Sequence, residues 1–163
     1  MQPRLLDIPA KTILGIGANY VPILSEQSNA AEVIGPLWDR FNARRNEITF
    51  ADPGVTYGVS TAIEDKNSMT HQAELRYIAG AEVSPLRGIP EGFEIVQIPA
   101  GLYAVFTHKG LIRDLGPSIK FAYSHWIPRS GRKIRNAPHF ELYDARFLHD
   151  SPDSELDICI PVT

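Results

Sequence analysis

The feature that most constrains the fold of this chain is an internal repeat of about 81 residues. Gly35-Pro36 and Gly116-Pro117 lie 81 positions apart, and so do Leu75 and Leu156, where strands are predicted to begin. This spacing is close to half of the 163 residues, which indicates a duplicated unit. The junction between the two copies is then the natural place for a pocket.

Two amphipathic helices are predicted, one in each half of the chain. The first has apolar side chains at i, i+3, i+4 and i+7, formed by Ile34, Leu37, Trp38 and Phe41. It is expected to begin between residues 30 and 35, because Pro36 is tolerated only in the first turn of a helix. The second begins near Gly116-Pro117, ends near Pro128 and has the same spacing at Ile119, Ala122, Tyr123 and Trp126.

Short runs rich in β-branched and aromatic residues predict the strands. They lie at residues 12–17, 55–63, 75–83, 93–98, 102–107, 139–147 and 156–162. The second and third runs flank a polar loop and predict a hairpin. We therefore predict an α+β fold in which two βαββ repeats form one antiparallel sheet with two main helices on one side. The repeats span about 10–83 and 93–162, and the whole chain, 1–163, is expected to be one domain.

Composition excludes several functional classes. The 16 basic and 19 acidic residues give a net charge of −3, which argues against direct nucleic-acid binding, because that binding needs a basic surface. The single cysteine excludes an internal disulfide and a multi-cysteine zinc site. There is no signal peptide and no apolar run of eighteen residues, so we expect a cytoplasmic protein that does not bind membranes.

Motifs for cofactors and metals are missing as well. The sequence has no glycine-rich phosphate loop, no His-Glu-x-x-His and no Gly-x-Ser-x-Gly. Its five histidines, His71 among them, share no ligand spacing. We therefore expect neither a metal nor a cofactor.

The strand at 139–143 offers the best candidate for a site. Alternation places His139, Glu141 and Tyr143 on one of its faces. If that face meets solvent, this is an ordinary half-exposed strand. If Glu141 lies instead in an aromatic pocket, a buried carboxylate would attract an organic cation, and aromatic faces would add cation–π contacts. Candidate walls are Trp126, Tyr123, Trp38 and Phe41, each of which core packing would equally explain, and for Phe41 core packing is the preferred interpretation.

Several segments together resemble one known family. They are Glu91-Gly92-Phe93, Ile98-Pro99-Ala100-Gly101-Leu102-Tyr103-Ala104-Val105-Phe106, Trp126-Ile127-Pro128-Arg129-Ser130-Gly131, Pro138-His139-Phe140-Glu141-Leu142-Tyr143 and Asp157-Ile158-Cys159-Ile160-Pro161-Val162. In order and spacing these are similar to the gyrase-inhibitor-like family, which includes the effector-binding domains of AraC-type and MerR-type multidrug-responsive regulators. The resemblance covers about residues 11–162 and implies two βαββ units with a pocket between them.

The resemblance also implies site residues and a partner. In the regulators a glutamate of the penultimate strand faces bound lipophilic cations, and Glu141 matches it, with Tyr143 as the next pocket position and Trp126 as an aromatic wall. The regulators carry a helix-turn-helix domain, for which this chain has no room. It is therefore expected to be a stand-alone binding module that would affect transcription only through a DNA-binding partner protein.

Three functions follow as hypotheses. The first is a binding module for lipophilic, often cationic aromatic compounds, whose site residues are Glu141, Trp126, Tyr143, Tyr57, Trp38 and Tyr123. The second is a hydrolase of strained, cyclopropane-containing electrophiles, in which Glu141 is the base and Tyr143 or Tyr57 the acid. The third is a protein-interaction module that sequesters a partner such as DNA gyrase.

Overall fold

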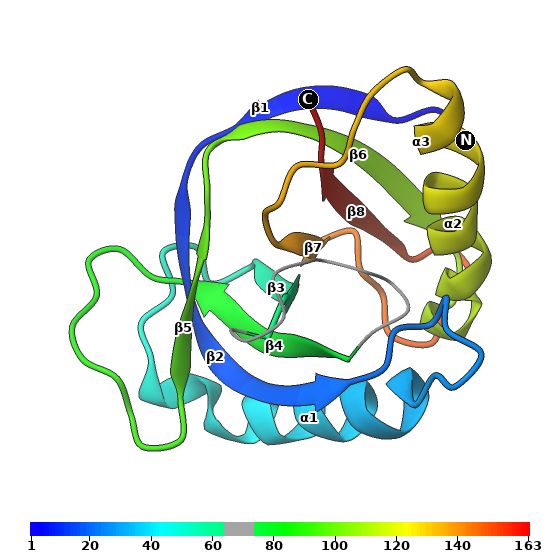
Figure 1. Cartoon of the computed structure of the whole chain (residues 1–163). Helices are drawn as coiled ribbons and strands as arrows, with labels where there is room; N and C mark the ends of the chain where they lie inside the picture. The colour runs from blue at the N-terminus through cyan, green and yellow to red at the C-terminus, as the bar shows by residue number, and fades with distance from the viewer. Residues whose placement is uncertain (64–73) are drawn as a thin grey trace.

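The computed structural model describes residues 1–63 and 74–163, so His71 lies outside the described residues. Within these ranges the chain forms one curled antiparallel sheet of eight strands and two main helical segments (Figure 1). The strands are β1 (Arg4–Ile8), β2 (Lys11–Tyr20), β3 (Thr56–Thr61), β4 (Leu75–Glu82), β5 (Glu94–Ile98), β6 (Gly101–Lys109), β7 (His139–Tyr143) and β8 (Glu155–Pro161). The helical segments are α1 (Ala30–Arg44) with η1 (Arg45–Glu47), and η2 (Ile112–Asp114), α2 (Leu115–Phe121), η3 (Ala122–Trp126) and α3 (Ile127–Arg129).

The order of strands in the sheet shows the duplication directly. It runs β1-β6-β8-β7-β3-β4-β2-β5, so each half has the same arrangement when read from the centre outward. The central strands β3 and β7 pair antiparallel and join the halves, and β3 and β4 form the predicted hairpin. The predicted α+β fold of two repeats in one antiparallel sheet is therefore confirmed.

The two edge strands, β1 and β5, are exchanged between the halves. β1 is at the N-terminus but pairs with β6 of the second half, whereas β5 pairs with β2 of the first. The sequence analysis missed β1, because both faces of this strand are largely open to solvent and no alternation of apolar and polar residues marks it. Leu5 and Leu6 illustrate this, since both are exposed although they are adjacent and point to opposite faces.

Both main helical segments cover the same face of the sheet, as predicted. Ala79, Gly58, Glu141 and Ile158 lie opposite one another on four successive strands and therefore share a face. The α1 helix packs over the first-half part of this face, and α2, η3 and α3 pack over the second-half part. The opposite face carries Tyr57, Phe140 and other buried strand residues, which form a second hydrophobic cluster.

The helices match the predictions, except for the position of Pro36 within the first helix. The α1 helix begins at Ala30, and Leu37 and Phe41 on its apolar face have no exposed surface. Pro36 lies in the second turn, so the argument that confined it to the first turn was wrong. Pro36 and Glu32, whose carbonyl group loses a hydrogen bond, are both exposed, so water can replace that bond. No helix in the described ranges is long and apolar enough to cross a membrane.

Candidate functional site

A cavity of about 110 Å³ lies between the two helical segments, over the central strands. Its walls come from the β2–α1 connection, α1, α2, η3 and strands of both halves. Most lining residues are aliphatic or aromatic, including Ile23, Ile34, Ile119, Tyr20 and Tyr123. Among the described residues that line the cavity, Glu141 is the one Asp, Glu, Lys or Arg side chain. The junction between the repeats thus holds a cavity to which the described residues contribute apolar surface and a single carboxylate.

Two tyrosine hydroxyl groups hold the Glu141 carboxylate. Tyr77 Oη of β4 donates to Glu141 Oε2 at 2.9 Å, and Tyr143 Oη of β7 donates to the same atom at 3.0 Å. Oε1 makes no side-chain hydrogen bond within the described part of the chain, and the Glu141 residue is partly buried and lines the cavity. Burial raises the pKa of Glu141, and the two hydroxyl groups partly oppose that rise by stabilising the ionised form.

A glycine in β3 makes room for these contacts. Gly58 is directly opposite Glu141, at the pairing of the two central strands. A Cβ atom at this position would lie 1.8 Å from Tyr77 Oη and 2.8 Å from Glu141 Oε2. The hydroxyl group of Tyr77 therefore occupies space that any other residue at position 58 would fill with its side chain.

Trp38 was expected to be a wall of the cavity, but it lies behind the carboxylate and does not line the cavity. Its Nε1 donates to Tyr77 Oη at 3.1 Å, and its ring meets the Tyr143 ring edge to face, with centroids 5.2 Å apart. The side chain contacts both tyrosines that donate to Glu141. The predicted residues Glu141, Tyr143 and Trp38 are thus brought together, but of these three only Glu141 lines the cavity, and Tyr143 and Trp38 lie behind it.

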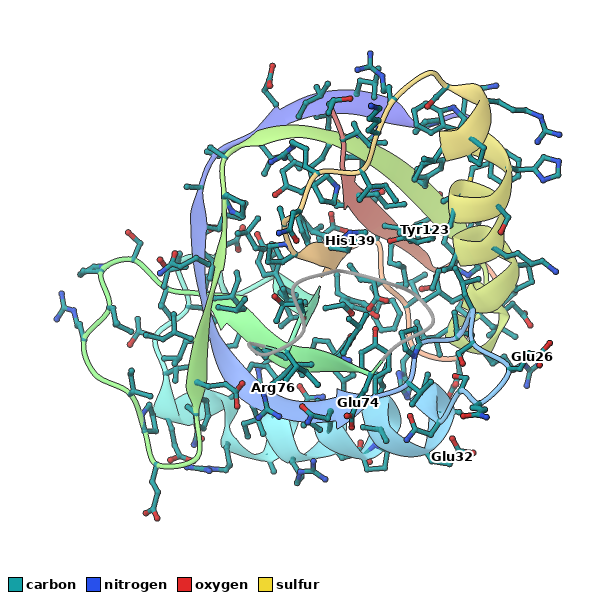
Figure 2. The ribbon with its side chains drawn as sticks, viewed as in Figure 1. Glu26, Glu32, Glu74, Arg76, Tyr123 and His139 are labelled. Atoms are coloured by element: carbon teal, nitrogen blue, oxygen red, sulfur yellow. The ribbon has the colours of Figure 1, made fainter. Side chains whose placement is uncertain are left out.

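Tyr123 lines the cavity, in agreement with the expectation for this residue. It belongs to η3, a π-helical turn, and Figure 2 shows its side chain pointing toward His139 of β7. The hydroxyl group of Tyr123 is hydrogen-bonded to His139 Nδ1, and the two rings are nearly parallel, with an interplanar angle of 10°. Burial holds the pKa of Tyr123 well above its ordinary value, so the phenol stays protonated.

Tyr57 and Trp126 do not line the cavity. Tyr57 is opposite Leu142 and packs against Phe140 on the enclosed face of the sheet, which separates its hydroxyl group from Glu141. The proposal of Tyr57 as the acid partner of Glu141 is therefore corrected, because strand alternation turns the two side chains to opposite faces. Trp126 meets Phe106 edge to face at 5.4 Å in the core of the second half. Phe41 is a core residue, the interpretation preferred for it.

Sequence reasoning missed Tyr77, Gly58, Tyr20 and Ser60. Tyr20 Oη and Ser60 Oγ are hydrogen-bonded at 2.7 Å beside the carboxylate site, and both residues line the cavity. Tyr77 reaches Glu141 because β3 pairs with β4 on one side and with β7 on the other. The repeat gave the strand order of each half, but nothing in the sequence specified which residues would stand opposite each other across β3.

The described ranges contain no group of three or more His, Cys, Asp or Glu residues able to hold a metal ion. The described residues that line the cavity supply one carboxylate, phenol hydroxyl groups, an imidazole and apolar surface. Such a set can attract a cation, accept a proton or donate hydrogen bonds.

Two curated relatives are transcriptional regulators. BrlR of Pseudomonas aeruginosa is 35% identical over 164 residues, which cover 99% of this chain and 56% of BrlR. The probable transcriptional regulator YgiV of Escherichia coli is 31% identical over 83 residues, 51% of each protein. The chain therefore spans about half the length of the curated relatives that it matches.

Solved structures share the fold. SAV2435 bound to tetraphenylphosphonium has a TM-score of 0.75 at 19% identity and covers the whole of this chain and 94% of that one. The EcmrR C-terminal domain has a TM-score of 0.60 at 18% identity, with coverage of 99% and 97%. A hydrolase from Listeria innocua is more distant, with a TM-score of 0.52, 11% identity and coverage of 99% and 92%. A model of the GyrI-like small molecule binding domain matches residues 1–163, and the chain belongs to this family.

Proposed function

We propose that the cavity binds lipophilic organic cations, with Glu141 as the counter-charge. The observation that carries this proposal is a carboxylate in an apolar, aromatic cavity whose described lining includes no lysine or arginine. An ionised carboxylate in such surroundings loses hydration, and a bound cation would compensate for that loss. SAV2435, which shares the fold, was solved with tetraphenylphosphonium, a lipophilic cation, and this supports the choice of ligand class.

The size of the cavity implies that its walls move when such a ligand binds. Ligand pockets typically enclose about 300–1,000 Å³, and the cavity has about 110 Å³. One wall is the β2–α1 connection, where Ile23 is 44% exposed and lies close to Gly116 of α2. Displacement of this connection would enlarge the cavity without disturbing Glu141.

The relatives support a proposal for the biological role. BrlR is named as a transcriptional regulator, and the EcmrR structures include a complex with DNA. We therefore propose that this domain senses small molecules in the cytoplasm and that a DNA-binding protein or segment conveys the signal to transcription. The helix-covered face, where ligand binding would move a wall, is the part of the domain best placed to transmit it.

The test is binding of tetraphenylphosphonium measured by calorimetry, beside its neutral analogue triphenylphosphine oxide. Glu141→Gln keeps the shape and the acceptor oxygen but removes the charge. We expect it to weaken cation binding by about 1–3 kcal/mol, with little change for the neutral compound. Absence of saturable cation binding, or an equal loss for both compounds, would contradict the proposal.

Hydrolysis of a strained electrophile is the second candidate, because two phenol hydroxyl groups contact the one carboxylate. Glu141 would take a proton from water as the water oxygen bonds to one ring carbon and a ring C–C bond breaks, and the Tyr143 phenol would protonate the other carbon of the broken bond. The proton on Glu141 would then return to the Tyr143 phenolate along the hydrogen bond between them. Mass spectrometry of a cyclopropane-containing electrophile after incubation distinguishes the two functions. A product one water heavier supports hydrolysis, and intact compound supports binding alone.

A further inference from the structure

Trp38 fixes the direction in which the Tyr77 hydroxyl group donates its proton. An indole N–H is a donor only, so in the 3.1 Å contact between Trp38 Nε1 and Tyr77 Oη the phenol oxygen must accept. Tyr77 has one proton left to donate, and its other partner is Glu141 Oε2 at 2.9 Å. The chain of hydrogen bonds therefore runs one way, from Trp38 through Tyr77 to Glu141.

We propose that Trp38 is a positioning residue which, through Tyr77, keeps a hydroxyl proton directed at Glu141 Oε2 and so holds the carboxylate ionised, with Oε1 open to the cavity. Its consequence for ligand binding rests on the proposed function. The effect of Trp38 on the carboxylate does not rest on the proposed function, because the hydrogen bonds are formed between side chains of the protein itself.

The packing around Tyr77 supports this role. The Tyr77 side chain is 1% exposed, so no water replaces either partner of its hydroxyl group. The Trp38 ring also packs against Tyr143, the second donor to Oε2, and so it contacts both hydroxyl donors. A donated N–H bond polarises the phenol and strengthens its O–H as a donor to the next acceptor.

The electrostatics act in the same direction. The hydrogen bond from Trp38 lowers the pKa of Tyr77, although burial dominates and keeps it well above ordinary values. The hydrogen bond from Tyr77 lowers the pKa of Glu141 against the rise caused by burial. In the described part of the chain, the other titratable groups that face or influence this carboxylate are Tyr143 and His139 on β7, Tyr20 on β2, Tyr123 on η3 and Cys159 on β8.

The direct test follows the side-chain carboxyl carbon of Glu141 by NMR across a pH series in the ligand-free protein. Trp38→Phe keeps an aromatic ring but removes the N–H donor, so we expect Glu141 to titrate at a higher pH than in the unmodified protein. Trp126→Phe is the matched control, because Trp126 packs on Phe106 and takes no part in the hydrogen-bond chain. We expect it to leave the titration unchanged.

A double-mutant cycle separates positioning from mere packing. In Tyr77→Phe the connection to Glu141 is already broken, so adding Trp38→Phe should produce no further shift in the Glu141 titration. An unchanged titration in Trp38→Phe, or the same shift with and without the Tyr77 hydroxyl group, overturns the proposal. If Trp38→Phe is too unstable to measure, Tyr77→Phe alone must raise the Glu141 titration, and failure to do so overturns it equally.

Binding shows the consequence. The measurement is made at a pH between the midpoints of the Glu141 titration in the unmodified protein and in Trp38→Phe. Calorimetry should then find that Trp38→Phe weakens tetraphenylphosphonium binding about three- to tenfold and leaves the binding of triphenylphosphine oxide unchanged. If the unmodified protein does not bind the cation while the titration still shifts, the proposed function fails and the role of Trp38 stands. If the cation binds but the titration does not shift, the role of Trp38 fails and the proposed function stands.

Discussion

Replacement of Gly58 by alanine adds one methyl group at the point where the two halves of the chain meet. The new Cβ would lie 1.8 Å from Tyr77 Oη and 2.6 Å from Tyr77 Cζ. Ordinary van der Waals contacts of a Cβ atom lie at 3.4–4 Å, so the hydroxyl group would have to retreat by more than an ångström. Tyr77 is 1% exposed in the core under α1, so its ring cannot move out into solvent.

The cost has two parts. Forcing a methyl group into a filled core typically costs about 1–3 kcal/mol. Separating Tyr77 from Glu141 removes a hydrogen bond to an ionised acceptor, worth about 1.5–3 kcal/mol. We therefore expect Gly58→Ala to lower the free energy of unfolding by roughly 2.5–6 kcal/mol and to weaken tetraphenylphosphonium binding as well.

Urea denaturation followed by circular dichroism measures this change, and Gly35→Ala supplies the control. Gly35 lies on α1 with no atom within 4 Å of an added Cβ, so the same substitution there should stabilise the protein by about 0.5–1 kcal/mol. Combining Gly58→Ala with Tyr77→Phe removes the closest clashing atom, so the pair should cost less than the sum of the single changes. Wild-type stability of Gly58→Ala, or strict additivity with Tyr77→Phe, would refute the steric argument.

Two other outcomes follow from the site. Burial raises the pKa of Glu141 in the folded state, so ionisation of this carboxyl group costs stability. The stability of the protein with protonated Glu141 is fully present below the pKa of this group in the unfolded chain, and it is lost as pH rises through the pKa in the folded protein. Glu141→Gln should therefore raise the thermal unfolding midpoint of the ligand-free protein at neutral pH, and the difference should shrink in acid. Tyr143→Phe should weaken tetraphenylphosphonium binding measured by calorimetry, whereas Tyr57→Phe should leave it unchanged, because Tyr57 faces the opposite side of the sheet. Equal effects of the two tyrosine changes would show that the site is placed wrongly.

Much of the fold was predictable because the duplication and the apolar periodicities are local features of the sequence. The helix faces around Leu37 and Ile119, the central hairpin and the placement of both helices on one side all follow from them. The edge strand β1 could not be predicted, because an exposed strand carries no alternating pattern of apolar and polar residues. Its position depends on pairing with β6, about a hundred residues later.

The candidate site was predictable in part. Alternation along β7 identified Glu141 and Tyr143 as neighbours on one face. The partners on other strands depend on register, which put Tyr77 beside Glu141 and turned Tyr57 away. Gly58 could not be identified either, since a glycine that makes room for a distant hydroxyl group looks like any strand glycine until the pairing is known.

The exchange of β1 and β5 makes each half of the chain dependent on the other for a strand. A cut in the connection between β4 and β5, at residues 83–93, would leave an N-terminal fragment whose own outer strand, β1, belongs beside β6 of the other fragment. The second fragment would in turn carry β5, the strand that completes the first. Such fragments would have interlocked edges as well as the shared β3–β7 junction, and the protein is suited to complementation from split halves, with the ligand cavity re-forming only upon their reassembly.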